Sequence, residues 1–448
     1  MDTYLFEEFE GVSAKAWKQK IQADLKGLDY NDTLLWHSIE GLTVRPFYTK
    51  EDQTNQQIPL SEDNFNICQS VFVDNEDVAN KLAVNSLQRG ANAIEFVANK
   101  TFDFKKLLEN IDSVNTPIYF KLNFLDVEFT KQLSNFTQSE KSYFNIDIIG
   151  NLAKTGNWFS NLNEDHEKLA QISSLNNCIA VNASLYQNAG ANCTQQLAYA
   201  LAHANEYLNH FGSSIASKIY FNFSVGSNYF FEIAKLRAFR ILWEALLKEY
   251  GLFEIQANIF TQPSLRNKTL YDYNVNMLRT TSECMSAILG GTNTIANISY
   301  DELFHKSNEF GERISRNQLL VIKEESGFEN AQNFADGSYY IETLTEQFAE
   351  KALDIFKQIE QGGGFLKQLK EGIIQRKISE AAQKEQELFD TGELVLLGTN
   401  KIQNPNDKMK NDLELFPFVK KRSEKTLIQP IIAKRLAEQL EQERLENE

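Results

Sequence analysis

The sequence is poor in the residues that build disulfide frameworks, zinc sites and membrane spans. Its four cysteines, Cys68, Cys178, Cys193 and Cys284, lie far apart and show no CxxC spacing. This pattern indicates free thiols in a reducing cytoplasm and gives no cysteine-based metal site. No apolar run approaches the length of a membrane span, and the acidic N-terminus lacks the basic and apolar regions of a signal peptide.

Positive charge is scarce relative to negative charge. The chain has 45 Lys and Arg against 61 Asp and Glu, which gives a net charge of -16. An acidic surface of this kind argues against nucleic acid or an anionic membrane as the main partner. Apolar residues, by contrast, are plentiful: 42% of the 448 residues are hydrophobic and 12% are aromatic. The chain can therefore bury a large core, and its length predicts more than one domain.

Short apolar runs alternate with helical patterns through the middle of the chain. The predicted strands are 70–75, 93–98, 117–124, 145–150, 178–185, 219–225, 253–260 and 292–298. A helical stretch fits into each gap, and the clearest are 76–89, 192–210, 228–249 and 271–289. Eight such units in about 230 residues predict a (β/α)8 TIM barrel of the α/β class, with an open doubly wound sheet as the main alternative.

The flanking segments do not continue the alternation. Residues 1–50 are interpreted as an N-terminal arm for partner contact, and residues 51–325 as the barrel. Residues 326–403 are predicted to form a helical extension of the barrel domain, in which the triple glycine 362–364 is a turn. Residues 404–448 are predicted to be a polar linker followed by a C-terminal helix.

The predicted strand ends offer little acid–base chemistry, although catalytic residues of such barrels lie there. Most of these positions are neutral, and none of the five histidines falls on one. Asp74 is the best isolated carboxylate, but a residue at that place can equally cap the next helix. The sequence contains no Walker motif, HExxH or nucleophile elbow. It therefore predicts a barrel without an evident catalytic constellation.

Large aromatic residues on the strands predict a filled barrel. Phe72, Phe96, Phe120 and Phe221 are expected to occlude the barrel axis, at least in part. A barrel that holds a long ligand along its axis would instead need small polar residues there. The more ordinary interpretation is a normal core of bulky side chains.

Several segments together resemble the methylmalonyl-CoA mutase family. They include FFEIAKLRAFRILW (230–243), SYDELF (299–304), ISRNQLLVIKEESG (314–327), DGSYYIETLTEQFAEKA (336–352) and IEQGGGFLKQLKEG (359–372). The match is long and ordered. The resemblance implies a (β/α)8 barrel through which acyl-CoA threads. It also implies the interconversion of methylmalonyl-CoA and succinyl-CoA by radical chemistry with adenosylcobalamin.

The chain departs from the family's active pattern at several places. FNICQS (65–70) meets the active WTIRQY stretch, so that Cys68 stands at the Arg position and Ser70 at the Tyr position. LYQNAGA (185–191) meets HMQEAGA, with Leu185 at the position of the catalytic His. NTIANI (293–298) meets QSLHTN, with Ala296 at its His position. The cobalt-ligating DxHxxG motif is absent, and the residues after 403 are too few for the domain that carries it.

These departures imply a specific place within the family. The chain resembles the small (beta) subunit, which is non-catalytic and pairs with a large catalytic subunit. Such a chain would bind no cofactor and no metal, and adenosylcobalamin and the acyl-CoA substrate would belong to the partner subunit. The alternative is an active acyl-CoA mutase barrel that pairs with a separate cobalamin-binding protein.

Overall fold

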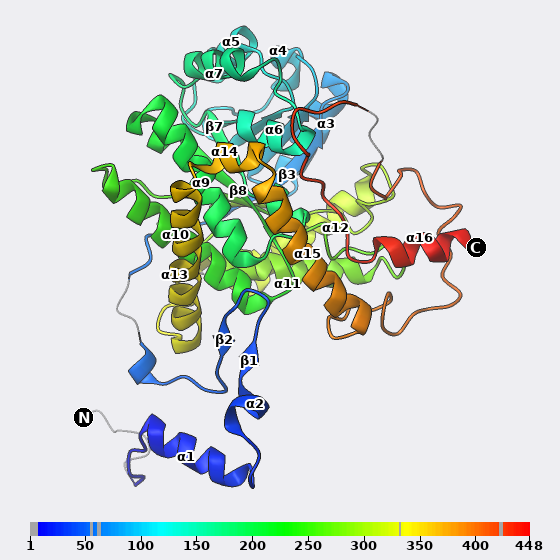
Figure 1. Ribbon diagram of the computed structural model, residues 1–448. Helices are drawn as coiled ribbons and strands as arrows, with labels where there is room; N and C mark the ends of the chain where they lie inside the picture. The colour runs from blue at the N-terminus through cyan, green and yellow to red at the C-terminus, as the bar shows by residue number, and fades with distance from the viewer. Residues whose placement is uncertain (1–7, 54–56, 61–63, 331–332, 421–423) are drawn as a thin grey trace.

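The computed structural model describes residues 8–53, 57–60, 64–330, 333–420 and 424–448; the first seven residues of the predicted arm lie outside the described residues. Eight parallel strands form a sheet that is nearly closed into a barrel, and helices surround it (Figure 1). The predicted TIM-barrel fold is therefore confirmed. The barrel strands are β3 (Asn66–Phe72), β4 (Ala93–Ala98), β5 (Ile118–Leu122), β6 (Ser142–Asn145), β7 (Ile179–Asn182), β8 (Ile219–Val225), β9 (Asn258–Pro263) and β10 (Thr294–Ala296).

The barrel closes between its first and last strands and has a seam between its fourth and fifth. β10 pairs with β3 in parallel, with Thr294 opposite Asn66. β6 and β7 are the ends of the hydrogen-bonded strand order. Two flanking hydrogen bonds join them: Phe144 N donates to Asn177 O at 2.8 Å, and Ala180 N donates to the carbonyl of residue 146 at 3.0 Å. A cavity lined by Asn145 and Asn182 lies at the carboxyl ends of these two strands.

Polar side chains at the strand ends begin the outer helices. Asn75, Asp147 and Asn192 each cap a helix by accepting a backbone N–H. The helices of this layer are α3 (Glu76–Gln88), α4 (Phe104–Leu107), α5 (Val127–Thr137), α6 (Ile148–Thr155), α7 (Leu162–Ile172), α8 (Ser184–Asn188), α9 (Cys193–Phe211), α10 (Tyr229–Glu249), α11 (Val275–Leu289) and α12 (Glu309–Leu320). Exposed Asp74 is not the cap of α3.

Several predicted strands were displaced: β3 begins four residues before the predicted 70–75, β9 begins five residues after the start of the predicted 253–260, and the end of 178–185 belongs to α8. The strand predicted at 145–150 was wrong. Residues 145–150 were expected to be extended, but β6 ends at Asn145 and α6 begins at Ile148. The carboxylate of Asp147 accepts the backbone N–H of Gly150 and so starts the helix. The apolar residues 148–149 therefore form the buried face of a short helix.

The N-terminal arm projects from the barrel body (Figure 1). It consists of α1 (Ala14–Asp24), α2 (Tyr30–Leu34) and an antiparallel hairpin of β1 (Trp36–His37) and β2 (Thr43–Val44). No residue of α1 is buried, and its contacts include Trp17 with Phe47 and Lys18 with Tyr30 within the arm.

Helices follow the barrel and pack against it. They are α13 (Tyr339–Gln361), α14 (Phe365–Lys370), α15 (Ile373–Thr391) and α16 (Glu438–Glu446). α13 packs on α9 and α10. The predicted glycine turn lies between α13 and α14, where Gly363 and Gly364 have φ of +98° and +92°. None of the helices in the described ranges is long and apolar enough to cross a membrane.

Candidate functional site

Aromatic rings fill the amino-terminal part of the barrel interior. The rings of Tyr119 and Tyr143 are stacked with centroids 4.4 Å apart, and Phe260 lies 4.8 Å from Tyr119. Tyr220 packs edge-on against Tyr143 at 5.5 Å. The Tyr119 hydroxyl makes a 2.8 Å hydrogen bond to the Thr294 hydroxyl. Together these four rings, hereafter the ring cluster, occupy the barrel axis.

The four phenylalanines that were predicted to occlude the barrel axis are not the residues that fill it. Phe221 lies 4.5 Å from Phe239 and 4.9 Å from Trp243, both on α10, so it points outward to the helices. Phe96 and Phe120 stack on each other in the main core between the sheet and the helices. Phe72 is 54% exposed at the end of β3. Because neighbouring residues of a strand face opposite sides, the residues that precede Phe120 and Phe221 face inward instead.

Three of the four sequence-predicted positions lie inside the barrel, and the structure brings two of them together. Cys68 and Ala296 are paired residues on β3 and β10 and belong to one buried cluster with the tyrosines. Burial raises the pKa of the Cys68 thiol well above its usual value, and the nearby Glu95 carboxylate raises it further. The Ser70 hydroxyl donates a 2.6 Å hydrogen bond to Glu95. Cys68 is therefore a neutral packing residue here.

The fourth position, Leu185, lies on α8 and lines a separate cavity of about 330 Å³ at the carboxyl ends of β4–β7. The side chains around it are mostly amides and lysines, among them Lys121, Asn145 and Lys154. Leu185 cannot donate or accept a proton. The structure thus places Leu185 at the mouth of the barrel, away from Cys68, Ser70 and Ala296 within it.

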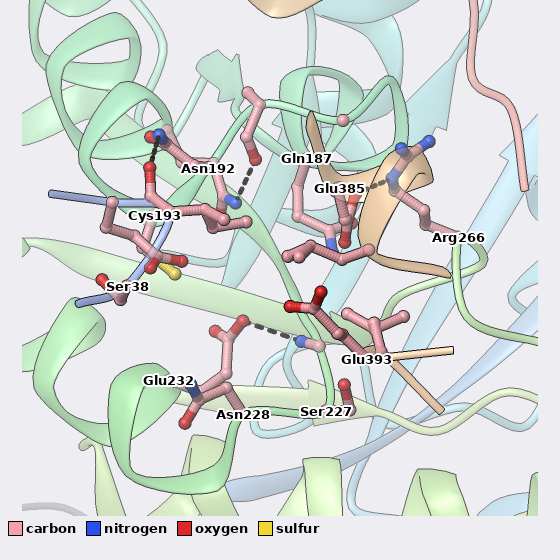
Figure 2. Close-up of a pocket in the computed structure, with 18 of the residues that line it drawn as sticks. Ser38, Gln187, Asn192, Cys193, Ser227, Asn228, Glu232, Arg266, Glu385 and Glu393 are labelled. Carbon is pink, nitrogen blue, oxygen red and sulfur yellow. Dashed lines mark hydrogen bonds and ion pairs between the residues drawn. The ribbon is translucent and has the colours of Figure 1, made fainter. Parts of the chain in front are cut away.

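A larger cavity of about 550 Å³ lies between the tip of the N-terminal hairpin, the loops after β7 and β8, and the end of α15 (Figure 2). Four glutamates line it: Glu40, Glu232, Glu385 and Glu393. Burial raises the pKa of the Glu40 carboxyl, and the neighbouring carboxylates of Glu385 and Glu232 raise it further. The cavity therefore presents negative charge and disfavours an anionic ligand.

The more buried of these carboxylates already have partners. Glu232 accepts the N–H of Gly226 at 2.8 Å and forms an ion pair with Lys235. Arg266 contacts Glu385 at 2.5 Å. Glu232 and Lys235, three residues apart on α10, thus form a buried ion pair. Arg240 instead donates to backbone carbonyls, including Ala257 at 2.8 Å.

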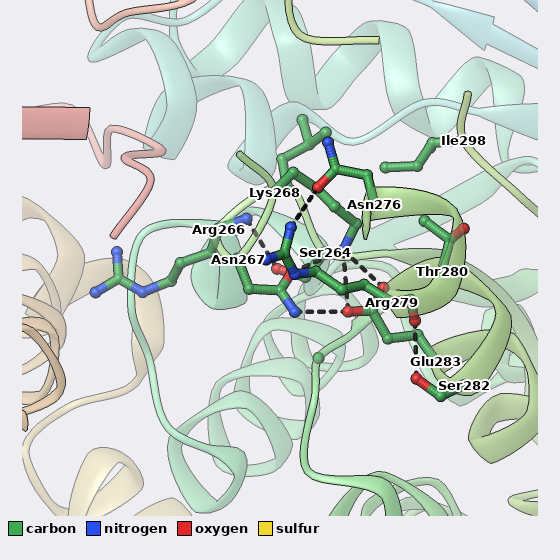
Figure 3. A network of polar contacts seen from close by, with 12 residues as sticks. Ser264, Arg266, Asn267, Lys268, Asn276, Arg279, Thr280, Ser282, Glu283 and Ile298 are labelled. Atoms are coloured by element: carbon green, nitrogen blue, oxygen red, sulfur yellow. Dashed lines mark hydrogen bonds and ion pairs between the residues drawn. The ribbon is translucent and has the colours of Figure 1, made fainter. Parts of the chain in front are cut away.

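A buried polar network holds the loop after β9 against α11 (Figure 3). The Lys268 ammonium lies 2.7 and 2.9 Å from the two carboxylate oxygens of Glu283, and the Asn267 amide donates to the same carboxylate at 2.6 Å. Burial raises the pKa of Glu283, which the Lys268 charge opposes. Burial also lowers the pKa of Lys268, which Glu283 opposes. The network is enclosed, so we interpret it as structural.

The one fully buried histidine in the described chain is also structural. His203 on α9 has Nε2 2.9 Å from a carboxylate oxygen of Asp147 and Nδ1 2.9 Å from the Tyr186 hydroxyl. Tyr207 donates to the same Asp147 oxygen at 2.7 Å. Burial raises the pKa of Asp147, but the charge of His203 and these hydrogen bonds bring it below its usual value. Both ring nitrogens of His203 thus lie against buried polar side chains of the protein itself.

The C-terminal segment crosses the carboxyl-end face of the barrel. Residues 427–441 contact the segments that follow β6, β7 and β9, including α6 and α8, through hydrogen bonds of 2.7–3.0 Å to backbone groups. These run from Ile431 N to Ala153 O, from Lys434 N to Asn188 O, from Leu436 N to Arg266 O, and from Leu270 N to Glu441 Oε1. Arg435 pairs with Glu441 at 2.5 Å, and both are buried. This face is where barrel enzymes carry their active sites.

No group of three or more His, Cys, Asp or Glu residues that could hold a metal ion occurs among the described residues. All four cysteines are buried and free. Sequence reasoning missed the ring cluster, Glu95 and both buried networks, because their members come from distant strands and helices.

Comparison with known proteins shows the family to which the chain belongs. The family model described as methylmalonyl-CoA mutase matches residues 128–446. The methylmalonyl-CoA mutase small subunit of Porphyromonas gingivalis is 33% identical over 445 residues, which cover 89% of this chain and 71% of that protein. The methylmalonyl-CoA mutases of Cereibacter sphaeroides and Rhizobium meliloti are 36% and 35% identical over 51% and 52% of this chain, but the match spans only about a third of their length. The chain therefore belongs to the methylmalonyl-CoA mutase family.

Proposed function

We propose that this chain is the small subunit of a heterodimeric, adenosylcobalamin-dependent methylmalonyl-CoA mutase and is itself non-catalytic. It supports a large catalytic subunit, which binds both the cofactor and the acyl-CoA substrate in the cytoplasm. The similarity to the Porphyromonas small subunit favours this assignment. The filled barrel axis is the observation that carries it.

The barrel interior does not fit a long acyl-CoA or a reacting radical. The ring cluster packs together with Cys68 and Ala296, and Glu95 on β4 is the paired residue of Tyr119 on β5. Glu95, which is only 3% exposed, places a buried carboxylate beside these rings and next to Ser70. An anionic CoA thioester needs donors or cations in a dry site, and a buried carboxylate opposes it.

The C-terminal segment adds a second obstacle. A cobalamin-carrying domain would have to approach the carboxyl-end face to reach the barrel interior. Residues 427–441 lie against α6, α8 and the loop after β9 on that face. The residues of this chain therefore do not fit the cofactor, and no reaction step runs through it here.

The N-terminal arm supports a role in assembly. Trp17 on α1 and Leu28 after it are 50% and 65% exposed, and α1 buries no residue against the rest of the described chain. Large apolar side chains on a projecting helix are typical of an interaction surface. The arm is proposed to contact the large subunit.

Mutase turnover tests the proposal directly. Methylmalonyl-CoA and adenosylcobalamin would be supplied to this chain alone, to the chain with a large catalytic subunit, and to the chain with a stand-alone cobalamin-binding protein. We expect turnover only with the large subunit. A Glu95→Gln variant in that complex should keep its turnover within about twofold, because a carboxylate that touches no substrate contributes nothing to the barrier.

Turnover by this chain with only the cobalamin-binding protein added, and no large subunit, would refute the proposal. It would instead establish the alternative, an active barrel subunit that borrows its cofactor domain. Failure of a chain without α1, residues 30–448, to bind the large subunit would support the assignment of the arm to assembly.

A further inference from the structure

The smaller cavity, at the carboxyl ends of β4–β7, has a different character from the rest of the barrel. It lies beside the seam between β6 and β7 and has a volume of about 330 Å³. A cavity of this size holds a small molecule and is too small for a CoA thioester. Its lining combines lysine and asparagine side chains, and Leu185 gives it one apolar wall.

Two side chains on neighbouring strands face this space with unused binding capacity. Asn145 on β6 is only 7% exposed, lines the cavity, and its amide makes no hydrogen bond to any described residue. Lys121 on β5 is its paired residue across the sheet and also lines the cavity. A buried amide without a partner is unfavourable, so this arrangement predicts that a ligand or water completes it.

The interior just below offers further unpartnered polar atoms. Asn182 on β7 lines the same cavity, and Asn222 on β8 is its paired residue. The Nδ2 of Asn222 and the hydroxyl of Tyr220 are enclosed and have no hydrogen-bond partner. Four adjacent strands therefore present amide or ammonium donors toward one region.

The negative groups nearby are already engaged. Asp147 lines the cavity, but its carboxylate accepts hydrogen bonds from the hydroxyl of Tyr207 and the N–H groups of Gly150 and Asn182. Burial raises the pKa of Glu302, in the loop after β10, to about 7; the carboxylates of Asp301 and Glu312 add to the rise, and the Lys121 ammonium opposes it. Glu302 is the carboxylate that competes for that ammonium.

We propose that this cavity binds a small oxyanion, a short carboxylate or phosphate. The Lys121 ammonium supplies the charge, and the amides of Asn145 and Asn182 donate hydrogen bonds. A charge-assisted hydrogen bond fixes such an anion more strongly than a neutral one. Leu185 contributes no acid or base, so the site binds and does not catalyse. The inference is independent of the proposed function.

Isothermal titration calorimetry of the full chain tests the site with three probes: acetate, malonate and inorganic phosphate, each against sodium chloride at matched ionic strength. We expect saturable binding of one equivalent of at least one probe. The preferred probe distinguishes a carboxylate ligand from a phosphate ligand. Absence of saturable heat for all three probes would overturn the proposal.

Variants distinguish binding in this cavity from nonspecific attraction of anions to the protein surface. Lys121→Met should weaken binding by about tenfold or more, since a hydrogen bond to a charged group is worth 1.5–3 kcal/mol in general. Asn145→Asp, which is nearly isosteric, should abolish it by adding a buried negative charge. Lys105→Met, on the exposed face of α4, is the matched control and should leave binding unchanged.

Glu302→Gln keeps the test decisive if the interior variants fail to fold, because Glu302 is exposed. Removal of the competing carboxylate should tighten binding by about twofold to fivefold, as expected for an exposed charge interaction of up to 1 kcal/mol. Equal affinity in the natural chain and in both Lys121→Met and Glu302→Gln would refute a site at Lys121.

Discussion

Replacement of Lys268 by Met removes one member of the buried network shown in Figure 3. The side chains of Lys268 and Glu283 are 2% and 0% exposed, and they touch at 2.7 Å. Met has a similar length and an apolar stem, so the change removes the ammonium with little change of volume. What remains is a buried Glu283 carboxylate with the Asn267 amide as its hydrogen-bond donor.

The expected loss of stability is large because the pair is broken on one side only. Removal of one partner of a buried ion pair costs about 3–5 kcal/mol, since an uncompensated charge stays in the interior. Replacement of both residues, in Lys268→Met with Glu283→Met, should bring the free energy of unfolding back to within about 2 kcal/mol of the natural chain. The single variant should therefore be less stable than the double variant.

The pH dependence has a definite sign. Burial raises the pKa of Glu283 in the folded chain, and the Lys268 charge opposes that rise. In the Lys268→Met variant the pKa rises further, so that the folded chain keeps a proton that the unfolded chain loses. The variant therefore loses stability as the pH increases, by up to about 1.4 kcal/mol per pH unit. Its defect should be smaller at pH 5.5 than at pH 8.

Urea denaturation of the full chain, followed by tryptophan fluorescence, measures these differences. Lys248→Met is the control, because Lys248 and Glu244 form a 2.8 Å pair that is about half exposed. That variant should change stability by less than about 0.5 kcal/mol. A Lys268→Met chain within 1 kcal/mol of the natural one at pH 8, or a defect that grows toward low pH, would refute the reasoning.

Three further changes test other parts of the structure. Asp147→Asn should lower the free energy of unfolding by about 2–4 kcal/mol, because it leaves buried hydrogen-bond donors unmatched. In the natural chain, the stability that the Asp147 carboxylate contributes should be lost as the pH falls through its folded-state pKa, which lies below its usual value. Denaturation as a function of pH measures both effects. Glu441→Gln should loosen the C-terminal segment, and limited proteolysis should then cut between residues 404 and 437 about tenfold faster. Tyr119→Ala should destabilise the barrel by about 3–5 kcal/mol without creating mutase turnover, and turnover in the variant would contradict the filled-axis argument.

The order of strands and helices could be predicted from the sequence because it depends on local patterns. The strands at 93–98 and 219–225 have the predicted bounds, and the helices that follow them are capped by Asp103 and Asn228. The predicted strand at 145–150 failed because two apolar residues after Asp147 fit a strand and a helix equally well. The hydrogen bond from Gly150 N–H to the Asp147 carboxylate is what favours the helix over the strand.

The inward face of each strand could not be predicted in the same way. Strands of a parallel barrel are buried on both sides, so alternation does not tell which residues face the axis. Phe120 and Tyr119 are both buried, yet only Tyr119 lies inside. The two polar networks were also invisible in sequence: His203 meets Asp147 across 56 positions and forms no local motif.

The C-terminal segment has a consequence for how the chain is made. Residues 427–441 leave the ribosome after every strand and helix of the barrel, yet they supply hydrogen bonds to the loops after β6, β7 and β9. Until these residues have been synthesised, the backbone groups that bind them lack those hydrogen-bond partners. The surface that Leu436 packs against in the folded chain is also exposed to water during this time. A nascent barrel of this protein therefore passes through a stage in which its carboxyl-end face is uncovered, until residues 427–441 pack against it.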